Sequence, residues 1–494
     1  MVTASGLRFT LNRILGTFKL LFKNKMAIVG IFLLSAFIFM ALAAPFLSPY
    51  GPNEQVAGPL AQPEWVMNFP DGYYLSRNIV DPSSATITSP ASLQAWTLSG
   101  SPANLANTVE SYAPSVSFRP DSKGSLQLTY TGNGPGTVRI SESFQYPYRG
   151  APARFIASIH YNLTGASAAT PVHVSVFIER TQQPQAQEFR ILSENETFSN
   201  HWLPTLTLDS NSVALVQALN TPSGFTPPGI IFSQQTTYSY GLDITFYGHQ
   251  TINIDDFQLQ VFGTAWGLLG TDFAGVDVFT QTLYGSRISL FVGLLAAGIG
   301  IGLGLLVGLL AGFLGKFVDE ILMRFTDMLL VIPSLPLLIV LVAVLGPSIW
   351  NIILIIGFLG WTGFARIIRS QVLTLRERPF IEAARASGAG PGRIILKHIF
   401  PNIVSLTYVN LALSVPAAIL TESALAFLGL SDPSVVSWGH MFENINISGD
   451  LSHFPPVWWW ILPPGFGIAL VSLSFILIGY ALDELFNPRL RKRR

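Results

Sequence analysis

The chain has 494 residues, of which 49% are hydrophobic and only 11% are Asp, Glu, Lys or Arg, and its mean hydropathy is +0.45. Soluble domains carry about 25% charged residues, so this composition argues against a cytosolic enzyme and for membrane spans. The 28 basic and 28 acidic residues balance, which gives no sign of nucleic-acid binding, and the lack of cysteine excludes disulfides and thiolate metal sites. We expect no catalytic residues, no metal site and no cofactor.

The first apolar segment, Met26–Leu47, is uncharged and has about the roughly 20 residues that a transmembrane helix needs. Basic residues precede it, as in a signal peptide, but it exceeds the usual h-region of about 7–15 residues, and Ala43-Ala44-Pro45 is a doubtful cleavage site. We therefore predict that residues 1–50 form a cytoplasmic N-terminus and an uncleaved first span.

Residues 51–263 differ in character, because Pro, Ser, Thr, Asn and Gln dominate and no run is apolar and long enough to span. Short alternating runs predict strands, and turn residues such as 132–136 separate them. In Val172–Ile178 the alternation predicts a strand with one solvent-exposed face. The simplest fold is an antiparallel β-sandwich, in one domain or two. The predicted strands are 125–130, 137–140, 155–161, 172–178, 238–246 and 251–262.

Five further apolar runs bring the predicted number of spans to six: 288–314, 328–345, 349–365, 403–430 and 457–478. Short loops retain Lys and Arg on the cytoplasmic side. Basic residues precede the first span and occupy the segments 316–324, 366–397 and 489–494, whereas 346–348 and 431–456 have none. This asymmetry predicts two cytoplasmic termini, a β-rich segment outside the cell, and Trp458–Trp460 at the outer membrane boundary.

Small residues and prolines predict how the spans pack. Glycines recur every four residues on one face of the second span, which favours a close approach of another backbone, although simple tolerance of glycine in membranes is the alternative. Prolines in the third and fifth spans predict kinks or broken turns. The glycines are Gly300, Gly304, Gly308 and Gly312, and the prolines are Pro333, Pro336 and Pro416.

The inside loop between the fourth and fifth spans, residues 376–401, combines both charge signs with small residues. The segment from Glu382 to Ser387 favours a helix that Gly388 would end with a left-handed cap. Residues 389–392 predict a turn, and Arg393–Phe400 a second short helix before Pro401. Such a helix-turn-helix is suited to docking into another protein. A solvated loop that only fixes topology would explain the arginines but not Glu-Ala-Ala with a glycine six residues after the glutamate.

The loop resembles the cytoplasmic signature of permease subunits of binding-protein-dependent ABC importers: Glu-Ala-Ala, three residues, Gly, nine residues, then Ile-x-Leu-Pro. Glu382-Ala383-Ala384, Gly388 and Pro401 match in register, with His398 and Phe400 at the Ile and Leu positions. That histidine, Leu269-Gly270-Thr271-Asp272 and Asn487-Pro488-Arg489-Leu490 are similar to the dipeptide and oligopeptide branch. The resemblance covers about residues 269–490 and the first span, and not the 51–263 insertion.

The resemblance implies an all-α permease domain of six helices, which are the first span and five further helices within residues 264–494. The extracytoplasmic all-β domain inserted after the first span, which is sandwich-like or jelly-roll-like, is predicted from the sequence itself and not from the resemblance. It implies four kinds of partner: a second permease, two cytoplasmic ATPase subunits, an extracytoplasmic binding protein and membrane lipid. We find no Gly-x-x-x-x-Gly-Lys-Ser/Thr phosphate loop, so ATP hydrolysis is expected on the separate ATPases. Their closure would act on the segment Glu382–Lys397, and the implied coupling residues are Glu382, Ala383, Ala384, Gly388, Arg393, His398 and Pro401.

Charged residues at membrane depth are candidates for function. Glu422, with Asn410 and Pro416, could line the pathway, or Glu422 could pair with another helix, and the sequence leaves both open. Asp327 is expected to pair with Arg324 on the same helix.

The outer segment supports weaker inferences. Ile252–Leu259 resembles the closing strand of carbohydrate-binding jelly-roll modules, and Trp96 and Trp202 could stack on sugars but are expected in the core. Asn162, Asn195 and Asn446 begin glycosylation sequons.

We hypothesise a plasma-membrane permease for peptides or oligopeptides, with oligosaccharides as the alternative cargo. A membrane-anchored adhesion or sensor protein leaves the Glu-Ala-Ala loop unexplained, and an ion-coupled transporter has only Glu422 to support it.

Overall fold

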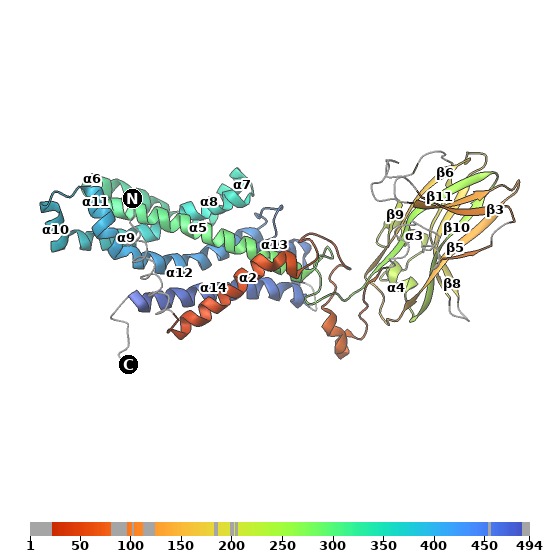
Figure 1. The fold of residues 1–494 in the computed structure, drawn as a ribbon, viewed down its shortest axis with the longest axis horizontal. Coiled ribbons are helices and arrows are strands. Elements are labelled where there is room, and N and C mark those ends of the chain that lie inside the picture. The colour runs from red at the N-terminus through yellow and green to blue at the C-terminus, as the bar shows by residue number, and fades with distance from the viewer. Residues whose placement is uncertain are drawn as a thin grey trace. The chain divides into compact units, whose positions relative to one another are not determined.

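The computed structural model describes residues 22–80, 96–100, 103–111, 124–181, 186–197, 202, 206–452 and 456–486. The chain divides into two compact units: a helical unit, Met1–Glu54 with Val278–Arg494, and a β-rich unit, Gln55–Asp277 (Figure 1). The basic residues Arg8, Arg13 and Lys19, the tail 489–494 and the Asn487–Leu490 motif lie outside the described residues.

The β-rich unit contains two antiparallel sheets that enclose one apolar core, as predicted. One sheet has the strand order β3-β4-β11-β6-β9 with β1 paired to β11, and the other has β2-β5-β10-β7-β8. All six predicted strands are present, as β4, β5, β6, β7, β10 and β11. The short helices α3 (Val213–Ala218) and α4 (Pro227–Ile231) connect strands. The strands are β1 (Ile79–Val80), β2 (Thr97–Ser99), β3 (Leu105–Ser111), β4 (Gly124–Tyr130), β5 (Gly136–Tyr146), β6 (Arg154–Thr164), β7 (Val172–Arg180), β8 (Gln187–Glu196), β9 (Leu206–Asp209), β10 (Thr236–Phe246) and β11 (Gln250–Phe262).

The prediction of a solvent-exposed face for β7 is wrong, because Ser175 and Phe177 on that face are buried. Strand β7 lies between β10 and β8, and long side chains of the neighbouring strands cover its outer face. The Arg139 guanidinium lies 4.2 Å from the Phe177 ring centroid and donates at 2.7 Å to both Asp243 and Glu188. Partial burial acts to raise the pKa of Glu188, but hydrogen bonds from Arg190 and Arg139 outweigh it and lower that pKa.

The helical unit contains five helices long and apolar enough to cross a membrane, or six if the bent pair α6–α7 is one span, among the residues described. Two of the five are composite: α8 continues into α9, and α11 continues through a π-helical turn into α12. The helices are α2 (Lys25–Leu47), α5 (Val278–Leu314), α6 (Lys316–Val331), α7 (Ser334–Leu345), α8 (Ile349–Leu359), α9 (Thr362–Arg376), α10 (Pro379–Ala386), α11 (Pro391–Ile394), α12 (Phe400–Phe427), α13 (Trp438–Ser448) and α14 (Trp458–Phe486).

The third predicted span is not one straight helix, because α6 and α7 meet at an angle of 90°. Ile332 is extended, the conformation favoured before proline, and Pro333 caps α7. The predicted break at Pro333 is therefore confirmed, whereas α12 continues without interruption through Pro416.

The fourth span also extends beyond its predicted end at Ala365, because α9 continues to Arg376.

Helix α5 packs against α8 and α9 along its glycine face. A Cβ atom on Gly304 would lie 2.7 Å from the Trp361 carbonyl oxygen, and one on Gly308 would lie 2.6 Å from that of Ala365. Such contacts are far shorter than any side chain tolerates. The glycines are therefore required for backbone approach, as predicted, and are not merely tolerated in the membrane.

Helix α13 is a short helix docked into the bundle through Trp438, whose side chain is fully buried. The indole N–H donates to the Thr282 carbonyl oxygen at 3.1 Å, and the ring meets Phe37 of α2 edge-on at 5.7 Å. Gly285 of α5 and Gly467 of α14 leave room for it. One side chain thus connects α2, α5, α13 and α14.

The Trp458–Trp460 run does not present three indoles together. Trp459 and Trp460 are buried inside the protein, and only Trp458 is exposed. The predicted position of this run at the outer membrane boundary stays a prediction, and of its three indoles Trp458 is the one with an exposed side chain.

Replacing Gly308 by Leu should prevent the close contact of α5 with α9 and severely lower the yield of folded protein. Where backbone atoms block the space, overpacking destabilises the folded state by roughly 3 kcal/mol or more. Gly302→Leu is the matched control, since nothing lies within 4 Å of a Cβ there. The effect is measured as the amount of monodisperse protein recovered after detergent extraction. Equal yields of the two variants would contradict the packing assignment.

Candidate coupling segment and translocation cavity

The coupling segment, defined here as residues 376–401, is anchored by buried isoleucines. Ile381 of α10, Ile394 of α11 and Ile399 of the π-helical turn are at most 2% exposed. They share one apolar cluster with Ile301, Leu309 and Phe313 of α5 and with Phe364, Ile368 and Val372 of α9. Because close-packed side chains transmit displacement, the segment is mechanically connected to the helices behind it.

The opposite surface of the segment is open. Glu382, Ala383, Gly388, Arg393 and Pro401 are exposed, while Ala384 and His398 are half-buried. The predicted coupling residues therefore lie in one short helix-turn-helix, with charged and small side chains outside and isoleucines inside.

Gly388 ends α10 with the predicted left-handed cap, at a φ of +78°. The Ala389 N–H donates to the Ala384 carbonyl oxygen and the Gly388 N–H to that of Arg385, which is the Schellman arrangement. Only glycine adopts this φ at little cost, which explains the fixed position of the turn.

The second short helix does not end before Pro401, contrary to prediction. Residues 391–394 form α11, a π-helical turn covers Ile395–Ile399, and α12 starts at Phe400 with Pro401 in its first turn. Proline is tolerated at a helix start because its missing N–H needs no partner there. The segment therefore runs directly into the span α12.

The segment lies at one end of α5. The Arg385 guanidinium is 5.7 Å from the Phe313 ring, and Arg376 Nη1 donates to the Gly312 carbonyl oxygen at 3.4 Å. At the other end, Ser48 and Thr280 share a hydrogen bond of 2.5 Å beside the points where the β-rich unit is inserted. Since α5 has 37 residues, these ends are about 55 Å apart.

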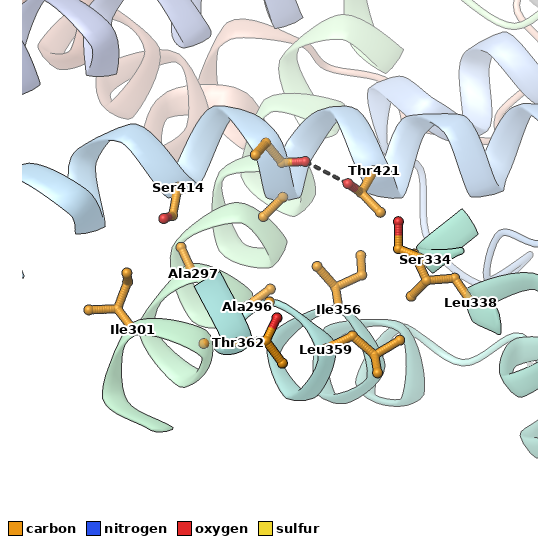
Figure 2. A pocket seen from close by; sticks show the side chains of 14 residues that line it. Ala296, Ala297, Ile301, Ser334, Leu338, Ile356, Leu359, Thr362, Ser414 and Thr421 are labelled. Carbon is orange, nitrogen blue, oxygen red and sulfur yellow. Dashed lines mark hydrogen bonds between the residues drawn. The ribbon is translucent and has the colours of Figure 1, made fainter. Parts of the chain in front are cut away.

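A cavity of about 310 Å³ lies between α5, α7, α8, the start of α9, and α12 (Figure 2). Its polar side chains are four hydroxyls, Ser334, Thr362, Ser414 and Thr421, and it has no charged lining residue. Thr421 donates to the Ala417 carbonyl oxygen at 2.7 Å, so this hydroxyl is already bonded. The remaining lining residues are Ala296, Ala297, Gly300, Ile301, Leu338, Ile356, Leu359, Gly360, Ala417 and Ala418.

The structure does not bring the three candidate pathway residues into one site. Asn410 precedes Ser414 by one helical turn on the cavity face of α12 and donates to the Leu406 carbonyl oxygen at 2.9 Å. Pro416 is buried, and neither it nor Glu422 lines the cavity.

Glu422 contacts α13. Its Oε1 accepts a hydrogen bond of 2.6 Å from Ser437, whose hydroxyl also accepts the His440 N–H and so caps α13. These contacts favour the structural alternative for Glu422.

The expected ion pair between Asp327 and Arg324 is absent. Asp327 instead bonds Arg366 of α9, and Arg324 lies 3.9 Å from Glu320. Arg369 of α9 forms a second link to α6, through two hydrogen bonds to Asp319 of 2.5 and 2.7 Å. Both links join positions far apart in the chain, so sequence spacing gave no signal for them.

In the β-rich unit, Trp96 is buried as expected, with its ring 5.2 Å from that of Phe257. One group of described residues, His160, Asp255 and Asp256, offers ligand atoms within 4.8 Å of one another. Acidic groups of this kind are common without an ion, so the expectation of no metal site stays a prediction.

Two family models match the chain. Residues 304–492 match the binding-protein-dependent transport system inner membrane component, and residues 16–63 match the N-terminal TM domain of oligopeptide transport permease C. Similar proteins include the dipeptide transport system permease protein DppC of Bacillus subtilis, which is 41% identical over 45% of this chain and 69% of that protein. The oligopeptide transport system permease protein OppC of the same organism is 36% identical over 50% of this chain and 79% of that protein.

A solved carbohydrate-binding module in complex with β-1,4-galactotriose is 12% identical over 37% of this chain and 98% of that chain. The TM-score of this comparison is 0.23. This chain covers more than two thirds of the length of both permease relatives, at 41% and 36% identity. The chain therefore belongs to the family of inner membrane components of binding-protein-dependent transport systems.

Proposed function

We propose that the chain is one permease subunit of an ATP-driven importer and forms, with a second permease, the pathway for peptides or oligopeptides delivered by an extracytoplasmic binding protein. The observation that carries this proposal is the coupling segment, an exposed helix-turn-helix packed through isoleucines onto α5 and α9. Two ATPase subunits would bind its outer surface and hydrolyse ATP.

The packing supports a route from the ATPases to the pathway. A displacement of α10 acts on Ile381 and hence on the cluster that contains Ile301 of α5 and Phe364 of α9. Ile301 also lines the cavity. A movement at the exposed surface would therefore change the width of the cavity through one shared set of side chains.

The chain is a multi-pass membrane protein, as its family and its five or six apolar helices indicate. We infer from the distribution of Lys and Arg that both termini are cytoplasmic and that the inserted β-rich domain lies outside. The placement of the coupling segment and of the insertion at opposite ends of α5 supports this orientation.

The lining of the cavity supports a cargo of varied side chains. Without a charged residue it neither attracts nor repels a particular charge, and its hydroxyls can bond a peptide backbone. The named relatives act on dipeptides and oligopeptides, which is why we favour peptides over oligosaccharides.

Glu382→Arg should abolish copurification of the ATPase subunits and the uptake of labelled oligopeptides, because it reverses a charge on the exposed face of α10 without disturbing buried Ile381. Glu320→Arg on α6 is the control, with a side chain that is likewise exposed, and should retain both. Uptake of oligosaccharides instead of peptides by the unaltered protein would correct the cargo. Full ATPase binding and transport in Glu382→Arg would refute the coupling assignment.

Ala417→Trp should block transport while ATPase binding persists, because the indole would fill much of the cavity from α12. Leu420→Trp places the same side chain about one turn further along α12, at an exposed residue that does not line this cavity, and should leave transport unchanged. Both are measured as peptide uptake per copy of assembled transporter. Normal uptake in Ala417→Trp would show that the pathway lies elsewhere.

A further inference from the structure

The β-rich unit is joined to the helical unit through a neck, defined here as residues 55–78 and 263–277. Its two segments pair with each other: the Val56 N–H donates to the Gly275 carbonyl oxygen, and the Leu60 N–H to that of Asp272. Further along, the Glu64 N–H donates to the Gly267 carbonyl oxygen. The neck is therefore an ordered part of the unit and not a slack linker.

The neck carries a patch of exposed large side chains, mostly aromatic. Within the described part of the β-rich unit, the other exposed large hydrophobic side chains, Val213, Phe225 and Tyr247, are isolated from one another in the sequence. A concentration of this kind marks an interaction surface, whereas single exposed residues need no explanation. The neck patch consists of Trp65, Phe69, Tyr73, Tyr74, Leu268 and Phe273, with exposures of 43–68%.

The patch is held in a defined shape. Trp65 Nε1 donates to the Leu268 carbonyl oxygen at 3.0 Å, and the Trp65 and Phe69 rings meet edge-on at 6.2 Å. The Arg149 guanidinium lies 3.9 Å above the Tyr73 ring. Next to it, a Cβ on Gly150 would lie 1.6 Å from the Tyr74 carbonyl oxygen, so the turn after β5 is pressed against the patch.

The chain length ties the patch to a membrane span. Phe273 precedes Val278, the first residue of α5, by five positions, and Leu268 precedes it by ten. An extended chain covers at most about 3.6 Å per residue, so these positions lie within about 18 Å and 36 Å of the start of α5. Hydrogen bonds hold Trp65 and its neighbours to the same segment.

We infer that the neck patch lies in the lipid headgroup layer and anchors the β-rich unit to the membrane surface. Trp and Tyr prefer this layer, because their rings favour the apolar side and their N–H or O–H groups the wet side. Arg149, exposed beside Tyr73, can meet lipid phosphates. The inference rests on the tether to a membrane span and depends neither on the cargo nor on the direction of transport.

A membrane contact at the neck would restrict the motion of the β-rich unit about the two neck segments that connect it to the helical unit. A protein partner is the competing occupant of an aromatic surface, but no feature of the patch selects one. The covalent connection of both neck segments to membrane spans, α2 before the neck and α5 after it, does select lipid.

Site-specific fluorescence quenching tests the inference. The chain contains no cysteine, so Phe69→Cys and Tyr74→Cys each give one labelling site in the full-length protein. The labelled protein is reconstituted in phosphatidylcholine–phosphatidylglycerol vesicles with brominated acyl chains. We expect quenching by these lipids at both positions to exceed that at the control sites by about two-fold or more, since buried interfacial groups sit at the acyl boundary.

Val213→Cys and Phe225→Cys are the matched controls, because both replaced side chains are exposed but lie in the connection between β9 and β10, outside the neck. They should be quenched by aqueous iodide and not by lipid. Two neck positions guard against a local effect of either substitution. Iodide quenching of both neck labels at the control level, with no lipid quenching, would overturn the inference and leave the patch as a surface for a protein.

Discussion

The close approach of other backbones to α5 is the constraint on which the helical unit depends. Helix α5 contacts α2, α6, α8, α9, α12, α13 and α14. In a bilayer the hydrophobic effect does not drive helices together, so association relies on van der Waals contact, which small residues make possible. The glycines of α5 provide this toward α9, and Gly293 provides it toward Ile419 of α12.

This constraint also explains why the coupling segment and the cavity are connected. Two larger side chains of α5, Ile301 and Phe313, belong to the apolar cluster that also contains Ile381 of α10. The same helix supplies Ala296, Ala297 and Gly300 to the cavity. One helix therefore contacts both the apolar cluster beneath α10 and the cavity.

The sequence predicted elements whose signals are local. The six alternating runs became strands, Gly388 took its left-handed cap, and Pro333 broke a helix, because each depends on residues within a few positions. It failed where neighbours in space decide. Phe177 is covered by Arg139 from another strand, and Asp327 found Arg366 rather than the nearer Arg324. Proline is generally tolerated in the first turn of a helix, but the sequence does not reveal that such a turn starts just before Pro401. The structure shows it, because a π-helical turn ends at Ile399 and α12 starts at Phe400.

The boundary between the two units differs between sequence and structure. The polar composition ends at Gly263, whereas the contacts assign residues up to Asp277 to the β-rich unit. Residues 264–277 include the Leu269–Asp272 motif that resembles the family, yet their hydrogen bonds join them to residues between 56 and 76 and group them with the β-rich unit. That pairing brings the two ends of the insertion together, so that the insertion leaves the helical unit as a closed loop. The entropic cost of closing a loop grows only slowly with the number of residues in it. The chain can therefore carry a whole β-rich domain at this point while α2 and α5 still meet through Ser48 and Thr280.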